Sequence, residues 1–138
     1  MGNSQRLKGA GGERELVKIL KEKGFDAARG HVFLHQPDAI GLPGIHIEVK
    51  RVENLVLKNA MQQAVVESKK KDGGIPTVFH RVNRGKWFVT MRDFDFMEFF
   101  IFDNPYTWHY LEIKDQMITT LLDEWIERYK GVTECEKA

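Results

Sequence analysis

Hydrophobic residues along this chain recur with the period of helices in some segments and with that of strands in others. Leu16, Ile19 and Leu20 lie at helical spacing and are followed by Gly24, which predicts a helix that ends at this glycine. Residues 45–50 alternate strictly between apolar and polar, which predicts a strand with one apolar face. The remaining predicted elements are strands at 25–28, 38–40, 77–82 and 87–91 and helices at 57–71, 93–100 and 113–130.

This order of elements predicts an α/β fold, with a mixed central sheet flanked by helices. Composition changes after Arg92, so we expect a core at 1–92 and an acidic, aromatic-rich helical extension at 93–138. Eight aromatic residues fall between positions 94 and 110, more than a small extension can bury alone. We therefore expect the extension to pack on the core or on a partner subunit, within a single folded unit.

The net charge of +1 hides an uneven distribution. Residues 1–90 hold 16 Lys and Arg against 9 Asp and Glu, and residues 91–138 hold 5 against 11. A basic body of +7 suggests a polyanionic partner, although charged residues also serve simply to solvate a surface. A single cysteine, the absence of an apolar run of about 18 residues and a polar N-terminus favour a cytoplasmic protein without a membrane span.

Glu48 and Lys50 lie two residues apart and share one face of the predicted strand 45–50. The opposite face is apolar, which indicates a strand inside the sheet, where charged side chains are costly unless they bind a metal or an anion. The alternative is a solvent-exposed edge strand. A turn at 42–44 would bring Asp38 close to Glu48, and two carboxylates supply the oxygen ligands that Mg²⁺ prefers. A neighbouring lysine can hold the attacking water and stabilise charge on a phosphate.

The pair Pro37-Asp38, followed after nine residues by Glu48-Val49-Lys50, resembles the signature of the PD-(D/E)xK nuclease superfamily. Lys8-Gly9, followed after three residues by Glu13-Arg14, is similar to the opening helix of archaeal-type and phage-borne Holliday junction resolvases. The resemblance covers about residues 6–91. Two features depart from it. The loop at 30–33 reads Gly-His-Val-Phe where the archaeal enzymes carry serines, and the extension has no counterpart.

The resemblance implies a restriction-endonuclease-like fold and a Mg²⁺-dependent endonuclease, with Mn²⁺ able to substitute. Its substrate would be branched DNA, most simply the Holliday junction of DNA recombination and repair. The implied metal ligands are Glu13, Asp38 and Glu48, and Lys50 would assist the attacking water. A helix glutamine near the site in phage relatives points to Gln63, with Gln62 as the competing choice. The expected DNA contacts are Arg14, Arg81, Arg84 and Lys86.

A four-way junction is close to two-fold symmetric and needs paired cuts, so we expect a homodimer, for which the aromatic extension could supply an interface. Three alternatives remain at this point. The first is a nuclease of the same fold that acts on flaps, nicked or linear DNA. The second is a DNA-binding accessory protein that does not cleave, and the third is an interaction protein built around the aromatic extension.

Overall fold

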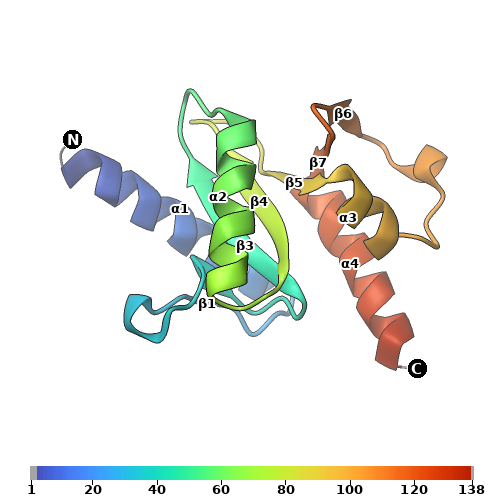
Figure 1. The fold of residues 1–138 in the computed structure, drawn as a ribbon, viewed down its shortest axis with the longest axis horizontal. Coiled ribbons are helices and arrows are strands. Elements are labelled where there is room, and N and C mark those ends of the chain that lie inside the picture. Colours follow the sequence, from blue (N-terminus) through green and yellow to red (C-terminus); the bar gives the residue numbers. More distant parts are fainter. Residues whose placement is uncertain (1–2, 138) are drawn as a thin grey trace.

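The protein is described here by a computed structural model that covers residues 3–137, with side chains at 11–134. A seven-stranded sheet forms its centre, in the order β1-β2-β3-β4-β5-β7-β6 (Figure 1). The strands are β1 (Ala28–Arg29), β2 (Ala39–Ile40), β3 (Ile45–Arg51), β4 (Ile75–Arg81), β5 (Phe88–Arg92), β6 (Glu112–Lys114) and β7 (Met117–Leu121). The helices are α1 (Asn3–Glu22), α2 (Leu57–Lys70), α3 (Asp93–Phe99) and α4 (Leu122–Lys137), with short 3-10 turns η1 (Val32–Leu34) and η2 (Pro105–Thr107).

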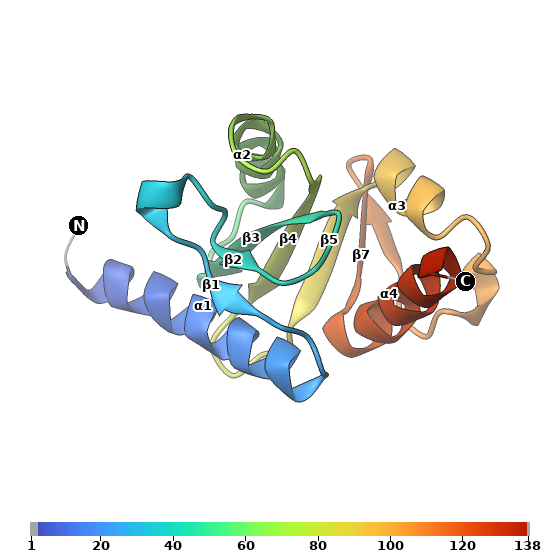
Figure 2. The same cartoon turned by 90° about the horizontal axis from the view of Figure 1, so that it is seen from below.

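Strands β3 and β4 are parallel, and all other neighbouring pairs are antiparallel. A parallel pair needs a crossover connection, and α2 provides it. Helix α2 covers one face of the sheet, while α1 and α4 lie on the opposite face (Figure 2). The predicted α/β fold with a mixed central sheet is therefore confirmed.

The two faces of β3 meet different surroundings. Ile45, Ile47 and Val49 pack into the large apolar core with α1, as the alternation predicted. The polar residues of β3 point the other way, toward α2, whose own apolar stripe forms a smaller core with Val78 and Met117. Since β3 lies between β2 and β4, it is an inner strand, and its buried polar face is not an exposed edge.

The helix predicted at 113–130 is wrong over its first half. Residues 112–121 form the hairpin β6–β7, which turns at Asp115 and Gln116, both with positive φ. Ile118, Leu121 and Leu122 also fit a helical spacing, which explains the error, but Ile118, Thr119 and Thr120 are β-branched and favour a strand. Pairing of β7 with β5 over five residue pairs then decides the outcome. The strand predicted at 25–28 is also displaced and occupies only residues 28–29.

The extension thus adds two strands to the central sheet as well as helices. Its aromatic residues divide into two sets. Phe96, Phe100 and Trp108 are buried and pack on one another, and Phe100 also contacts Trp125 of α4 and the partly buried Phe99. The exposed set consists of Phe94, Phe102, Tyr106 and Tyr110. The division of the chain at residue 92 into core and extension stays a prediction.

Candidate active site

Antiparallel pairing of β2 with β3 brings two of the predicted acids together. Asp38 immediately precedes β2, where Ala39 pairs with Ile47. The backbone N–H of Val49 donates a hydrogen bond of 2.9 Å to Oδ2 of Asp38, which fixes this carboxylate beside Glu48. The hairpin through 42–44 that the sequence predicted is therefore present, and it carries Asp38 to the polar face of β3.

Glu48 and Lys50 face α2, and the helix supplies a partner for the lysine. Glu48 is only 4% exposed, and its Oε1 lies 3.7 Å from Nζ of Lys50. The same Nζ donates a hydrogen bond of 2.8 Å to Oε1 of Gln63. Gln62, the competing choice from sequence, lines a separate groove beside Arg92. In this geometry Gln63 is the glutamine that contacts the predicted catalytic lysine.

Glu13 approaches the same place from α1, but its carboxylate is already paired. Arg29 of β1 reaches it with Nε at 3.0 Å and Nη2 at 2.9 Å. The sequence did not predict this role for Arg29, because Arg29 and Glu13 are sixteen positions apart and come into contact only in the folded chain. This ion pair holds α1 against the short strand β1.

These side chains line one cavity of about 650 Å³. Its walls come from α1, β3, α2 and the segment that follows β3, and the lining residues are Glu13, Asp38, Glu48, Val49, Lys50, Arg51, Val52, Glu53, Asn54 and Gln63. Within the described residues no three His, Cys, Asp or Glu side chains already lie close enough together to hold a metal ion. Of the three predicted ligands, Glu13 already has a partner in this structure, because it is paired with Arg29.

Asp38 in the cavity and His46 behind it both have shifted pKa values. Burial raises the pKa of Asp38 to about 6, and the nearby charges of Glu48 and Glu13 act in the same direction. Burial disfavours the charged form of His46, yet the nearby carboxylates of Glu48 and Asp72 outweigh the effect of burial, so the pKa of His46 is raised. Carboxylates crowded in this way repel one another, and a cation placed between them would relieve that repulsion.

A buried histidine supports Glu48 from behind. His46 is completely buried, with Nδ1 2.8 Å from Oδ1 of Asp72 and Nε2 3.6 Å from Oε2 of Glu48. His46 belongs to the polar face that the alternation at 45–50 predicted, whereas nothing in the sequence pointed to Asp72, which lies just beyond α2 and 26 positions away. The row Asp72, His46, Glu48 restricts the orientation of the Glu48 carboxylate.

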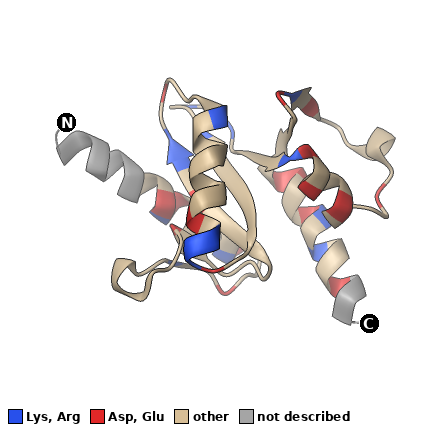
Figure 3. Ribbon diagram, viewed as in Figure 1, with Lys and Arg blue, Asp and Glu red and all other residues tan. Residues whose placement is uncertain are grey.

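The predicted DNA contacts fall into two groups. Arg14, Arg84 and Lys86 are exposed, the latter two in the turn between β4 and β5. Arg81 is engaged instead: its guanidinium pairs with the carboxylate of Glu15 on α1. Arg84 and Lys86 are therefore the turn residues that stand free to meet a phosphate. The acidic residues that the sequence concentrates after position 90 are spread over α3 and α4 (Figure 3).

Fold and cavity together define the class. The mixed sheet presents two acids and a lysine opposite a helix glutamine, which is the arrangement that the sequence resemblance predicted for a restriction-endonuclease-like nuclease. The family model described as archaeal Holliday junction resolvase (Hjc) matches residues 4–104. The chain belongs to this family, and its function is that of a Holliday junction resolvase, a nuclease.

One solved structure can be compared directly. Hjc of Archaeoglobus fulgidus, described as a Holliday junction resolvase from an archaeal hyperthermophile, is similar over 87% of this chain and 88% of its own, at 21% identity and a TM-score of 0.46. A search of curated protein sequences found no match to this chain. Along the part of the chain that the structure describes, no helix is long and apolar enough to cross a membrane.

Proposed function

We propose that this protein cuts four-way DNA junctions in a Mg²⁺-dependent reaction, with Mn²⁺ able to replace Mg²⁺. The observation that carries the proposal is the convergence of Asp38, Glu48 and Lys50 on one cavity, with the lysine 3.7 Å from Glu48 and bonded to Gln63. Enzymes of the resolvase family are divalent-metal-dependent nucleases in general, and two carboxylates from adjacent strands provide the oxygen ligands that Mg²⁺ takes.

Asp38 and Glu48 would hold the metal, with Glu13 as a third ligand once its carboxylate leaves Arg29. The donor set fits, because it consists of carboxylate oxygens, and burial together with the charges of Glu48 and Glu13 raises the pKa of Asp38. A bound divalent cation would supply Lewis-acid chemistry, lowering the pKa of a water and offsetting charge on the phosphate. His46 and Asp72 would keep the Glu48 carboxylate in position.

Lys50 has the geometry of the group that handles the attacking water. Gln63 holds its Nζ by a hydrogen bond of 2.8 Å, and the side chain is 27% exposed, so the ammonium reaches the cavity while its orientation is restricted. From there it can donate to the water and to a non-bridging phosphate oxygen. Gln63 then acts by orienting Lys50.

Phosphate contacts would come from Arg14 on α1 and from Arg84 and Lys86 in the β4–β5 turn, with Arg81 able to contribute only if it leaves Glu15. The turn is joined to the cavity wall, since the backbone N–H of Asn83 donates to Glu53, which lines the cavity. DNA held by these residues would place a backbone phosphate over the predicted metal ligands.

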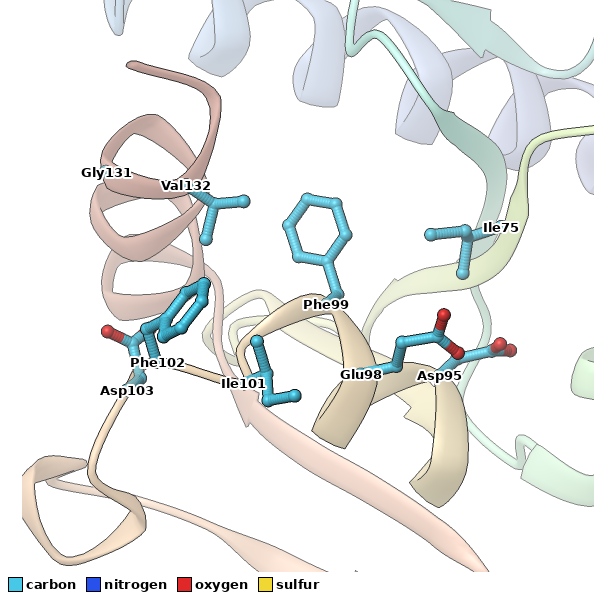
Figure 4. Close-up of a pocket in the computed structure, with 9 residues that line it drawn as sticks. All are labelled: Ile75, Asp95, Glu98, Phe99, Ile101, Phe102, Asp103, Gly131 and Val132. Carbon is cyan, nitrogen blue, oxygen red and sulfur yellow. The ribbon is translucent and has the colours of Figure 1, made fainter. Parts of the chain in front are cut away.

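We further propose that the protein acts as a homodimer in the cytoplasm of a prokaryotic cell or phage-infected host. One chain offers one such cavity, whereas paired cuts in a two-fold symmetric junction need two. The extension offers a surface on which a second copy could pair. A groove of about 520 Å³ lies between α3 and α4 and is lined by apolar residues, among them Phe99, Ile101 and Phe102, with acidic residues at its rim (Figure 4).

The test is cleavage of a labelled four-way junction and of a linear duplex of the same sequence, each with Mg²⁺, with Mn²⁺ and with EDTA. We expect symmetric cuts in the junction with either metal and none with EDTA. Equal cutting of flaps, nicked or linear DNA would support the broader nuclease alternative. Binding without any cutting would overturn the proposal in favour of a non-cleaving accessory protein.

A further inference from the structure

The loop between β1 and β2 exposes three consecutive apolar residues. Val32, Phe33 and Leu34 form the short turn η1 and are 85%, 95% and 65% exposed. Exposed apolar residues are ordinary when they are scattered singly, but three in succession at the tip of one loop form a continuous apolar surface. Nothing in the fold or in the cavity chemistry accounts for them.

The conformation of the loop itself holds these side chains in solvent. The backbone N–H of Gly30 donates to the carbonyl of Asp38, which closes the base of the loop, and His31 accepts bonds from Leu34 and Gln36 across its tip. A side chain on Gly30 would place its Cβ 1.6 Å from the Pro37 carbonyl oxygen, so only glycine permits this closure. The loop is therefore braced, and it presents Val32, Phe33 and Leu34 outward.

The loop also lies beside the candidate active site. Its N-terminal end is Arg29, which binds Glu13, and its C-terminal end runs directly into Asp38. In Figures 1 and 2 it stands out from the edge of the sheet, and in Figure 2 it lies between α1 and α2, the two helices that flank the cavity. The base of the loop therefore adjoins Asp38, one of the predicted metal ligands.

We propose that Val32, Phe33 and Leu34 form an apolar wedge that packs against unstacked bases at the branch point of DNA. This inference rests on the proposed function, since it places branched DNA at the cavity. In a continuous duplex the base faces are covered by stacking, and an apolar side chain finds only sugars and phosphates. At a branch point stacking is interrupted, and an aromatic ring or an aliphatic side chain can cover the exposed face of a base. The wedge therefore adds binding energy to branched DNA alone.

The flanking residues favour DNA over an apolar protein partner. His31 and His35 border the wedge and are exposed, so the apolar surface is narrow, and it adjoins a cavity of carboxylates and a lysine suited to a phosphodiester. A ring as narrow as Phe33 matches one base, whereas a stable protein interface needs a far wider apolar area.

The experiment compares Phe33→Ala with Tyr106→Ala, which removes an equally exposed ring, 93% accessible, from the extension. Binding is measured by fluorescence anisotropy in EDTA, on a four-way junction and on a linear duplex, with 2-aminopurine at the branch point as a second reporter. We expect Phe33→Ala to weaken junction binding about tenfold, to leave duplex binding within about twofold, and to abolish the protein-induced 2-aminopurine change. Tyr106→Ala should match the wild type, and Phe33→Trp should retain the preference for the junction.

Equal loss on both DNAs, no loss on either, or an unchanged 2-aminopurine signal would overturn the wedge. So would a shift of Phe33→Ala to a different oligomeric state in light scattering, because the loop would then be a pairing surface between two copies. Thermal melting of each variant confirms that it is folded, and Leu34→Ser provides a second test of the same surface. Failure of the two proposals can be distinguished. If the wild type binds junctions through Phe33 but never cuts them, the wedge stands and the proposed cleavage activity is overturned. If the wild type cuts junctions while Phe33→Ala binds them normally, the cleavage activity stands and the wedge is overturned.

Discussion

Two neighbouring strands, β3 and β4, each carry a histidine, and the surroundings of the two histidines shift their pKa values in opposite directions. His46, on β3, is buried between the carboxylates of Glu48 and Asp72, and these carboxylates keep its pKa above the ordinary value despite burial. His80, on β4, is bonded only to the hydroxyl of Thr90 and stacks on Phe88, and burial lowers its pKa to about 4. The difference lies in the partners, because carboxylates flank His46, whereas a hydroxyl and an aromatic ring contact His80.

Comparing the cavity with the extension distinguishes residues placed for chemistry from residues that stabilise the fold. Crowded carboxylates destabilise the protein until a cation or a substrate compensates them, so residues of this kind indicate a role in chemistry. The extension holds stacked rings instead: Trp125 lies over Tyr129 with a centroid separation of 5.1 Å and meets Phe79 and Phe100 edge-on. We expect substitutions at the two ends to separate cleavage from stability.

The largest effect should follow Asp38→Asn, which removes a charge from the cavity. We expect cleavage of a four-way junction to fall by at least about a thousandfold, or about 4 kcal/mol of transition-state stabilisation. Asparagine still accepts the Val49 hydrogen bond, and one of the crowded charges is gone, so the free energy of unfolding should not decrease. Single-turnover cleavage and urea unfolding measure the two quantities. Wild-type cleavage by this variant would show that Asp38 is not a metal ligand.

The converse change is Trp125→Ala, which empties the centre of the aromatic cluster. Trp125 is completely buried, so we expect unfolding to become easier by about 3–5 kcal/mol. Cleavage per folded molecule should stay near the wild-type value, because Trp125 does not line the cavity. Tyr106→Ala, at an exposed position, should change stability by no more than about 0.5 kcal/mol. Denaturant unfolding followed by tryptophan fluorescence and circular dichroism provides the comparison.

The pH dependence of stability should reflect His80. Its folded pKa of about 4 lies below that of the unfolded chain, near 6.5, so its contribution is complete above pH 6.5 and is lost as the pH falls toward 4. The loss should approach about 3 kcal/mol at its largest. Urea unfolding of the wild type and of His80→Gln at pH 7, 5.5 and 4 isolates this group. If the free energies of unfolding of the wild type and of His80→Gln fall by the same amount between pH 7 and pH 4, His80 does not contribute to the pH dependence and the prediction is wrong.

The smallest effects concern DNA affinity. Arg84→Ala and Lys86→Ala should each weaken binding uniformly across DNA substrates and reduce the slope of log K against log salt by about 1. Arg81→Ala should instead lower stability, because Glu15 loses its guanidinium partner. Lys114→Ala, at an exposed position on β6, is the matched control and should leave the slope unchanged. Binding that does not respond to salt in the wild type would remove the polyanion argument.

Local sequence patterns predicted the parts of the site that local geometry determines. The alternation at 45–50 gave β3 with Glu48 and Lys50 on one face, and the turn at 42–44 brought Asp38 beside them. Arg29 and Asp72 could not be found in this way, because their partners lie 16 and 26 positions away and meet them only in the folded chain. The choice between Gln62 and Gln63 depended on the rotation of α2 about its axis, which a mixed apolar stripe leaves open.

The prediction of a long helix at 113–130 failed for a related reason. Its apolar spacing suits either structure, and the available edge of β5 selects the strand. A single sequence does not show that β5 has an edge with which another strand can pair. The roles assigned to the site residues from sequence stay predictions until the substitutions above are made.

Glu15 has a mechanical consequence for how the protein meets its substrate. Its carboxylate accepts a hydrogen bond from the Trp87 indole at 2.8 Å, pairs with Arg81 and lies 3.6 Å from Arg51. Helix α1 is therefore clamped to the base of the β4–β5 turn, so Arg14 and Lys86 keep a fixed separation. If Arg14 and Lys86 contact DNA as predicted, the spacing of the phosphates would have to adapt to this fixed distance.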